Sequence, residues 1–151
     1  MDLSFRDIKK SDIDTCLSIM QKNYDETNDS FYSRNLIIDL QDIFIKDDIY
    51  KSNCRICLSG DEIVGFGCYK QSKMSFDIYE LFWINVKYEY QNKWIGKLII
   101  KDIEDDIRTY ETHYEHYQIL FSTKKSYFYQ KLWYTTIFSN ESKNEIMLKS
   151  F

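Results

Sequence analysis

A polar loop that runs into an apolar helical pattern is the first segment with potential chemistry. Positions 86–100 read VKYEYQNKWIGKLII, and the apolar residues recur at helical spacing after the polar stretch. A helix N-terminus presents backbone N–H groups without acceptors and is a ready site for phosphates. Lys93 and Lys97 add positive charge there. These residues are compatible with an anion-binding loop, but taken alone they favour an ordinary strand-to-helix connection.

Cysteine and histidine patterns predict neither a metal site nor a covalent nucleophile. Cys54 and Cys57 form a CxxC, but residues three apart in a strand point to opposite faces. His113 and His116 lie in a polar connection with no second pair of ligands, which is typical of a solvated loop. No histidine is placed to activate a serine or cysteine. We expect no metal and no covalent enzyme intermediate.

Composition limits the class of protein. The 151 residues suit a single domain over residues 1–151, and a net charge of −4 argues against a nucleic-acid partner. The longest apolar run, Leu81 to Ile84, is too short to span a bilayer, and the charged start MDLSFRD is unlike a signal peptide. We therefore expect no membrane association and a cytoplasmic location. The chain lacks alanine and proline, which indicates a genome rich in A and T, and such a codon bias explains part of its 17% aromatic content.

Hydrophobic periodicity predicts alternating strands and helices around one mixed sheet. Strands are expected at 3–9, 56–58, 63–69, 76–87, 117–121, 135–138 and 145–150, and helices at 13–24, 36–44, 95–109 and 124–133. Ser11 is expected to cap the first helix, and the run at 81–84 indicates burial on both faces. The strand–helix–strand unit from 76 to 122 should be right-handed, with its strands parallel.

Two segments resemble motifs of the GNAT superfamily of N-acetyltransferases. Residues 91–96, QNKWIG, are similar to the Q/R-x-x-G-x-G/A loop of motif A, and residues 126–138, SYFYQKLWYTTIF, are similar to the FY-x-KLGF of motif B. Both stand in the family's order and spacing, and the expected element order agrees with the GNAT layout through the whole chain. The resemblance implies a mixed α/β fold. Its central, mostly antiparallel sheet would have about seven strands flanked by about four helices, and a splayed parallel pair would form the acyl-CoA cleft.

The resemblance also implies an activity, which is transfer of an acetyl group from acetyl-CoA to a primary amine by direct attack on the thioester. The acceptor could be a small molecule, a peptide N-terminus or a lysine, and a homodimer is left open. The implied cofactor contacts are Ile84, Asn85 and Val86 with the pantetheine arm, Gln91, Asn92, Lys93, Trp94, Ile95, Gly96 and Lys97 with the pyrophosphate, and Ser122 beside the pantetheine.

Two residues are candidates for the proton transfers. Tyr129 matches the motif B tyrosine that protonates the departing CoA thiolate in many family members. Glu80 lies six residues before Val86, where the histone-acetylating branch places its catalytic glutamate, and its apolar neighbours predict burial. A neutral amine needs such a base, because an alkylamine has a pKa of about 10.4. The plainer alternatives are a solvent-facing Glu80 and a Tyr129 that only packs the core.

Two tryptophans depart from the family pattern. Trp94 and Trp133 replace glycines, which permit close backbone approach and left-handed dihedral angles. A tryptophan is not expected to provide either, so the loop must open differently or the ring must turn outward. These departures favour the main alternative to an enzyme, a GNAT-like module that binds acyl-CoA or another ligand without efficient turnover. A structural protein that uses an aromatic surface is a third interpretation.

Overall fold

The computed structural model describes residues 1–110 and 116–151. The strands are β1 (Leu3–Asp7), β2 (Asn53–Ser59), β3 (Glu62–Gln71), β4 (Ile78–Val86), β5 (Gln118–Thr123), β6 (Thr135–Ser139) and β7 (Glu145–Ser150). The helices are α1 (Ile13–Tyr24), α2 (Phe31–Ile45), α3 (Ile95–Tyr110) and α4 (Ser126–Gln130), with 3₁₀ turns at Lys10–Asp12 and Tyr88–Tyr90. The connection predicted around His113 lies outside the described residues.

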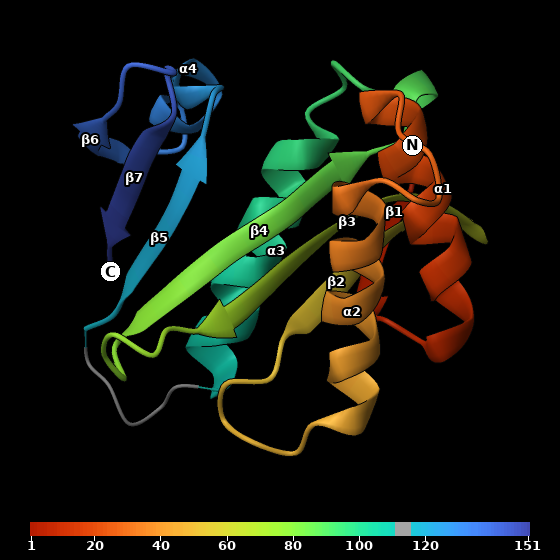
Figure 1. Cartoon of the computed structure of the whole chain (residues 1–151), viewed down its shortest axis with the longest axis horizontal. Coiled ribbons are helices and arrows are strands. Elements are labelled where there is room, and N and C mark those ends of the chain that lie inside the picture. Colours follow the sequence, from red (N-terminus) through yellow and green to blue (C-terminus); the bar gives the residue numbers. More distant parts are fainter. Residues whose placement is uncertain (111–115) are drawn as a thin grey trace.

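One mixed sheet forms the centre of the described structure (Figure 1). Its seven strands lie in the order β1-β2-β3-β4-β5-β7-β6, and all neighbours are antiparallel except β4 and β5. The parallel pairing covers only three residue pairs, from Ile78–Gln118 to Glu80–Leu120, and beyond it the two strands diverge. The predicted fold class and the parallel strand pair are therefore confirmed.

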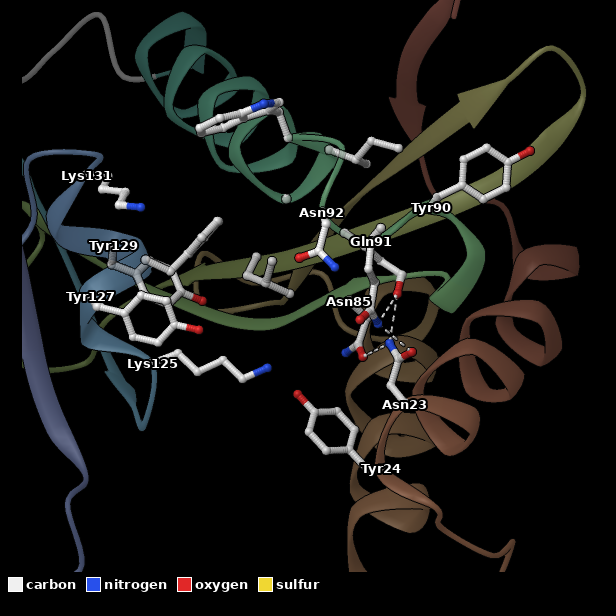
Figure 2. Close-up of a pocket in the computed structure, with 16 residues that line it drawn as sticks. Asn23, Tyr24, Asn85, Tyr90, Gln91, Asn92, Lys125, Tyr127, Tyr129 and Lys131 are labelled. Carbon is white, nitrogen blue, oxygen red and sulfur yellow. Dashed lines mark hydrogen bonds between the residues drawn. The ribbon is translucent and has the colours of Figure 1, made fainter.

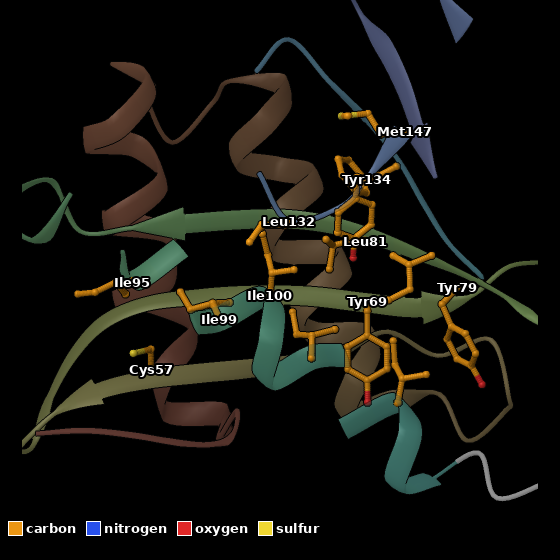
Figure 3. Packing of buried hydrophobic residues seen from close by; sticks show 14 of the residues in the cluster. Cys57, Tyr69, Tyr79, Leu81, Ile95, Ile99, Ile100, Leu132, Tyr134 and Met147 are labelled. Carbon is orange, nitrogen blue, oxygen red and sulfur yellow. The ribbon is translucent and has the colours of Figure 1, made fainter. Parts of the chain in front are cut away.

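The helices cover both faces of the sheet. In Figure 1, α1 and α2 lie on one face and α3 on the other. The apolar stripe of α3, which includes Ile99, Ile103 and Ile107, is fully buried against the strands (Figure 3). Gly67 in β3 makes this close approach possible, since a Cβ there would lie 2.7 Å from Ile99 and 2.6 Å from Ile84. The start of α3 is thereby held against the end of β4.

Several local predictions were wrong. Ser11 does not cap α1; instead the Asp12 carboxylate accepts the Lys9 N–H at 2.7 Å and an Arg6 N–H at 2.6 Å. The helix predicted at 124–133 is shorter, since α4 spans Ser126–Gln130, whereas the helix predicted to carry Leu36 and Phe44 is present as α2 and begins after the Ser30 cap. The run 81–84 is not buried on both faces: Leu81 alone of its four residues is buried, because a bulge interrupts the β3–β4 register there.

No described helix is long and apolar enough to cross a bilayer. No cluster of three or more His, Cys, Asp or Glu side chains within residues 1–110 and 116–151 could hold a metal ion.

Candidate functional site

A cavity of about 440 Å³ opens where β4 and β5 diverge (Figure 2). It brings together most of the predicted site residues, namely Ile84, Asn85, Val86, Gln91, Asn92, Trp94, Ile95, Gly96 and Tyr129. Seven lining residues were not predicted from the sequence, namely Asn23, Tyr24, Tyr90, Lys125, Tyr127, Phe128 and Lys131. One wall therefore comes from α1, β4 and the loop before α3, and the opposite wall from α4.

The loop before α3 has a backbone suited to anions. Asn92 and Trp94 have left-handed φ angles of 61° and 66°, whereas Lys93 between them does not. Such an alternation turns successive N–H groups toward one side and forms an anion-binding concavity. The Leu98 N–H donates to the Trp94 carbonyl at 3.1 Å, and the N–H groups before it at the start of α3 have no acceptor within the helix. The backbone here therefore offers N–H groups that an anionic group could contact.

Both tryptophans have left-handed backbone conformations, which glycine adopts most readily. Trp94 has φ 66° and Trp133 has φ 69°, and their rings are 66% and 84% exposed. The expectation that tryptophan cannot take the glycine dihedral is wrong, and the expectation of an outward ring is right. A left-handed residue other than glycine costs about 1–2 kcal/mol. The left-handed conformation at Trp94 and at Trp133 therefore carries a cost in stability.

Three side-chain amides tie the first wall together. Asn23 donates to the Asn85 side chain at 3.0 Å and to the Val86 carbonyl at 2.9 Å. Gln91 donates to Asn23 at 3.0 Å and to the same Val86 carbonyl at 3.1 Å. Asn85 is buried, so these bonds satisfy a polar group that water does not reach. We call Asn23, Asn85 and Gln91 the amide clasp, which joins the end of α1 to β4 and to the loop.

Lys93 and Lys97, which were predicted to contact the pyrophosphate, are not among the residues that line the cavity. The Lys93 ammonium donates to the Glu89 carbonyl at 3.1 Å, and the Lys97 ammonium lies 5.8 Å from the centre of the Trp94 ring. Local partners therefore hold both side chains. The lysines that do line the cavity, Lys125 and Lys131, come from the other wall.

Tyr129 carries its hydroxyl on an aromatic wall. Its ring packs 4.3 Å from Phe121 and 5.0 Å from Phe128, measured between ring centroids. Figure 2 shows the hydroxyl directed into the cavity. Burial, with a smaller contribution from Tyr24, raises the pKa of Tyr129 to about 12. The hydroxyl therefore keeps its proton at neutral pH and can donate it.

Glu80 and Ser122 lie in a second hollow of about 440 Å³, which Asp39 of α2 also lines. Glu80 accepts the Ser72 hydroxyl at 2.8 Å and lies 3.8 Å from the Lys70 ammonium. Its side chain is 36% exposed, so the predicted burial is wrong. Ser122 is exposed. The structure thus brings neither residue to the cavity that holds Tyr129 and instead places both where the two strands begin to part.

The chain resembles known proteins in three-dimensional structure but not in sequence. No protein-family model matches the chain, and no curated protein matches it in sequence. A GNAT-family protein from Desulfovibrio desulfuricans superposes with a TM-score of 0.80 at 12% identity, over 99% of this chain and 98% of that one. The PaiA N-acetyltransferase of Thermoplasma acidophilum, solved with coenzyme A, gives 0.76 at 15% identity over all of both chains. The chain has the GNAT acetyltransferase fold.

The likeness extends to GNAT structures of different named activity. The ribosomal-protein-S18-alanine N-acetyltransferase of Escherichia coli superposes with a TM-score of 0.67 at 10% identity, over 99% of this chain and 93% of that one. The predicted resemblance is therefore confirmed at the level of the fold. Identities between 10% and 15% leave substrate and chemistry to be argued from the site itself.

Proposed function

We propose that this chain is an acyl-CoA-dependent N-acyltransferase that moves an acetyl group from acetyl-CoA to a primary amine. The cavity at the divergence of β4 and β5 carries the proposal. It combines a loop of N–H donors suited to a pyrophosphate with a tyrosine hydroxyl suited to a leaving thiolate. A neighbour of the same fold solved with coenzyme A supports the assignment.

The end of β4 would bind the pantetheine arm. Beyond Glu80, no strand within residues 1–110 and 116–151 pairs with the edge of β4 that faces β5, and an extended ligand can pair with such an edge. The Val86 carbonyl already accepts hydrogen bonds from Asn23 and Gln91, which occupy both of its lone pairs. We therefore assign the pantetheine contact to the backbone of Ile84, two residues earlier on the same edge, rather than to Val86.

The chemical step needs two proton transfers. The amine nitrogen attacks the thioester carbonyl carbon, a C–N bond forms, and the C–S bond breaks. Tyr129 gives its proton to the departing sulfur, because its pKa of about 12 keeps the hydroxyl protonated. Glu80, in the hollow on the α2 side of the sheet, takes the proton of the amine directly or through a water molecule. The acceptor would then enter from that hollow, opposite to the cofactor.

Calorimetric titration with coenzyme A is the first test. Binding should be measurable and should weaken with added salt, since N–H dipoles and lysines contact phosphates. Absence of heat and of a thermal shift at millimolar CoA would overturn the proposal. Release of CoA thiol from acetyl-CoA would then be followed with a panel of small amines, peptide N-termini and lysine peptides. Binding without release for every acceptor would leave the binding module as the function.

A further inference from the structure

The charge of the cavity differs in sign from that of the whole protein. The chain carries a net charge of −4, yet the lining residues include two lysines, Lys125 and Lys131, and no carboxylate. Within residues 1–110 and 116–151, neither lysine makes an ion pair, whereas Lys22 and Lys87 beside the loop pair with Glu89 and Glu62 respectively. Two unpaired cations in one cavity indicate an anionic ligand.

The two lysines stand at opposite ends of α4. They are six positions apart, which corresponds to about 9 Å along a helix. In Figure 2, Lys125 extends toward the end of the cavity where Tyr24 lies, and Lys131 lies away from it. Neither comes from the wall that holds the N–H loop of residues 91–96. The loop and Lys131 can therefore hold two different anionic groups of one ligand.

Trp94 supplies an apolar surface beside this charge. Trp94 lines the cavity and is 66% exposed, and the Lys97 ammonium lies 5.8 Å from the centre of its ring. An exposed indole is a stacking surface for a nucleobase. Because the left-handed backbone turns the ring outward, the ring leaves the N–H loop open and borders the cavity.

We infer that Trp94 and Lys131 form a subsite for the 3′-phosphorylated adenosine of coenzyme A, with the indole stacked on the adenine and the ammonium on the 3′-phosphate. This inference rests on the proposed function, because it assigns the outer end of the same ligand. It makes the protein selective for CoA over the form that lacks the 3′-phosphate. The pyrophosphate belongs to the loop and the 3′-phosphate to α4.

The phosphate half is tested by titrating CoA and 3′-dephospho-CoA into the wild type, Lys131→Gln, Lys125→Gln and Lys124→Gln. Lys124 is an exposed lysine of the same segment that does not line the cavity. The wild type should prefer CoA about fivefold, the scale of one partly exposed ion pair. Lys131→Gln should remove this preference by weakening CoA alone, and Lys124→Gln should keep it.

The adenine half uses Trp94→Leu, with Trp133→Leu as the matched control on a second exposed, left-handed tryptophan. Trp94→Leu should weaken CoA and 3′-dephospho-CoA by the same factor of about ten and leave 4′-phosphopantetheine unchanged. Trp133→Leu should change none of the three affinities.

Several outcomes would overturn the subsite. Equal affinity of the wild type for CoA and 3′-dephospho-CoA would remove the phosphate contact, and loss of selectivity in Lys125→Gln alone would move it to the other lysine. A Trp94→Leu variant that loses affinity for 4′-phosphopantetheine would place the indole on a different part of the ligand. In each of these cases CoA still binds, so the proposed function stands. If the wild type bound no CoA, both the proposed subsite and the proposed function would be wrong.

Discussion

The two walls of the cavity are built by different physical means. The wall from α1, β4 and the loop is held by directed hydrogen bonds, with Asn23 and Gln91 sharing the Val86 carbonyl. The wall from α4 is held by aromatic packing, and within the described residues no hydrogen bond is made by the hydroxyl of Tyr129. Hydrogen bonds hold the backbone of the loop in a fixed position, which suits binding of a charged ligand. Apolar surroundings disfavour the charged form of Tyr129 and keep its hydroxyl protonated. Each wall therefore suits one part of the proposed reaction.

The largest effect is expected from a residue that lies on neither wall. Glu80→Gln should lower kcat/KM by about 10²–10⁴-fold if Glu80 takes the proton of the amine. The variant should also lose the acidic limb of the pH–rate profile, since a base acts only after deprotonation. Steady-state rates between pH 5 and 9 measure both effects, with Glu141→Gln in the exposed β6–β7 turn as the control. An acidic limb with an unchanged midpoint would exclude Glu80 as the base.

Tyr129→Phe tests the aromatic wall. Kcat should fall by about 10²-fold while KM changes little, because the proton is delivered only as the thiolate develops. Tyr127→Phe is the matched control, as a neighbouring tyrosine that lines the same cavity. A group with a pKa of about 12 stays protonated below that pH, so Tyr129 should not cause any alkaline loss of activity below about pH 11. An unchanged kcat in Tyr129→Phe would assign it to core packing.

Asn23→Ala tests the hydrogen-bonded wall. It removes the donor to buried Asn85 and to the Val86 carbonyl, and an unsatisfied buried polar group costs about 1–3 kcal/mol. Urea unfolding should show this loss of stability, and titration should show weaker CoA binding because Gln91 also loses its acceptor. Asn35→Ala on the exposed face of α2 is the control. A less stable variant with unchanged CoA affinity would make the amide clasp purely structural.

The sequence predicted what depends on local pattern and failed where distant segments meet. Periodicity and the βαβ unit were sufficient for the sheet, and motif spacing selected Gln91, Asn92, Trp94, Ile95, Gly96 and Tyr129, which line one cavity. Asn23 was missed because it contacts Asn85 from 62 positions away, and no local pattern marks such a pair. Lys131 was visible within the FYQKLW segment, but only the fold shows that it lines the cavity.

The charged residues were the least predictable part of the site. Lys93 and Lys97 were expected at the phosphate loop because they are adjacent to it in sequence, yet their side chains are held outside the cavity by Glu89 and Trp94. The ammonium group of a lysine can lie far from its own backbone, because the side chain is long and flexible. Its location therefore cannot be inferred from the position of the residue in the sequence. Glu80 was expected to be buried by its neighbours, but Lys70 and Ser72 hold it at a partly exposed position.

The smallest effects are expected when Trp94 or Trp133 is replaced by glycine. The two variants test whether a tryptophan that lines the cavity affects CoA binding differently from one that does not. Trp94 and Trp133 share a left-handed backbone and an exposed ring, but only Trp94 lines the cavity. Glycine would relieve a cost of about 1–2 kcal/mol and introduce an entropy cost of about 0.5–1 kcal/mol. Both variants should therefore gain between zero and about 1.5 kcal/mol in free energy of unfolding, measured by urea titration.

Their CoA affinities should differ, because only one ring can contact the ligand. Trp94→Gly should weaken CoA by about tenfold through loss of a stacking surface, whereas Trp133→Gly should leave it unchanged. The opposite sign has a distinct meaning: if the indole at 94 narrowed the pyrophosphate loop, its removal would tighten CoA binding. That result would favour the alternative function, a module that binds acyl-CoA without efficient turnover. In that case Trp94 would impair the loop of residues 91–96 as a site for the pyrophosphate. The exposed ring and the retained left-handed φ of 66° instead favour a loop adapted around the tryptophan, with the ring serving the ligand.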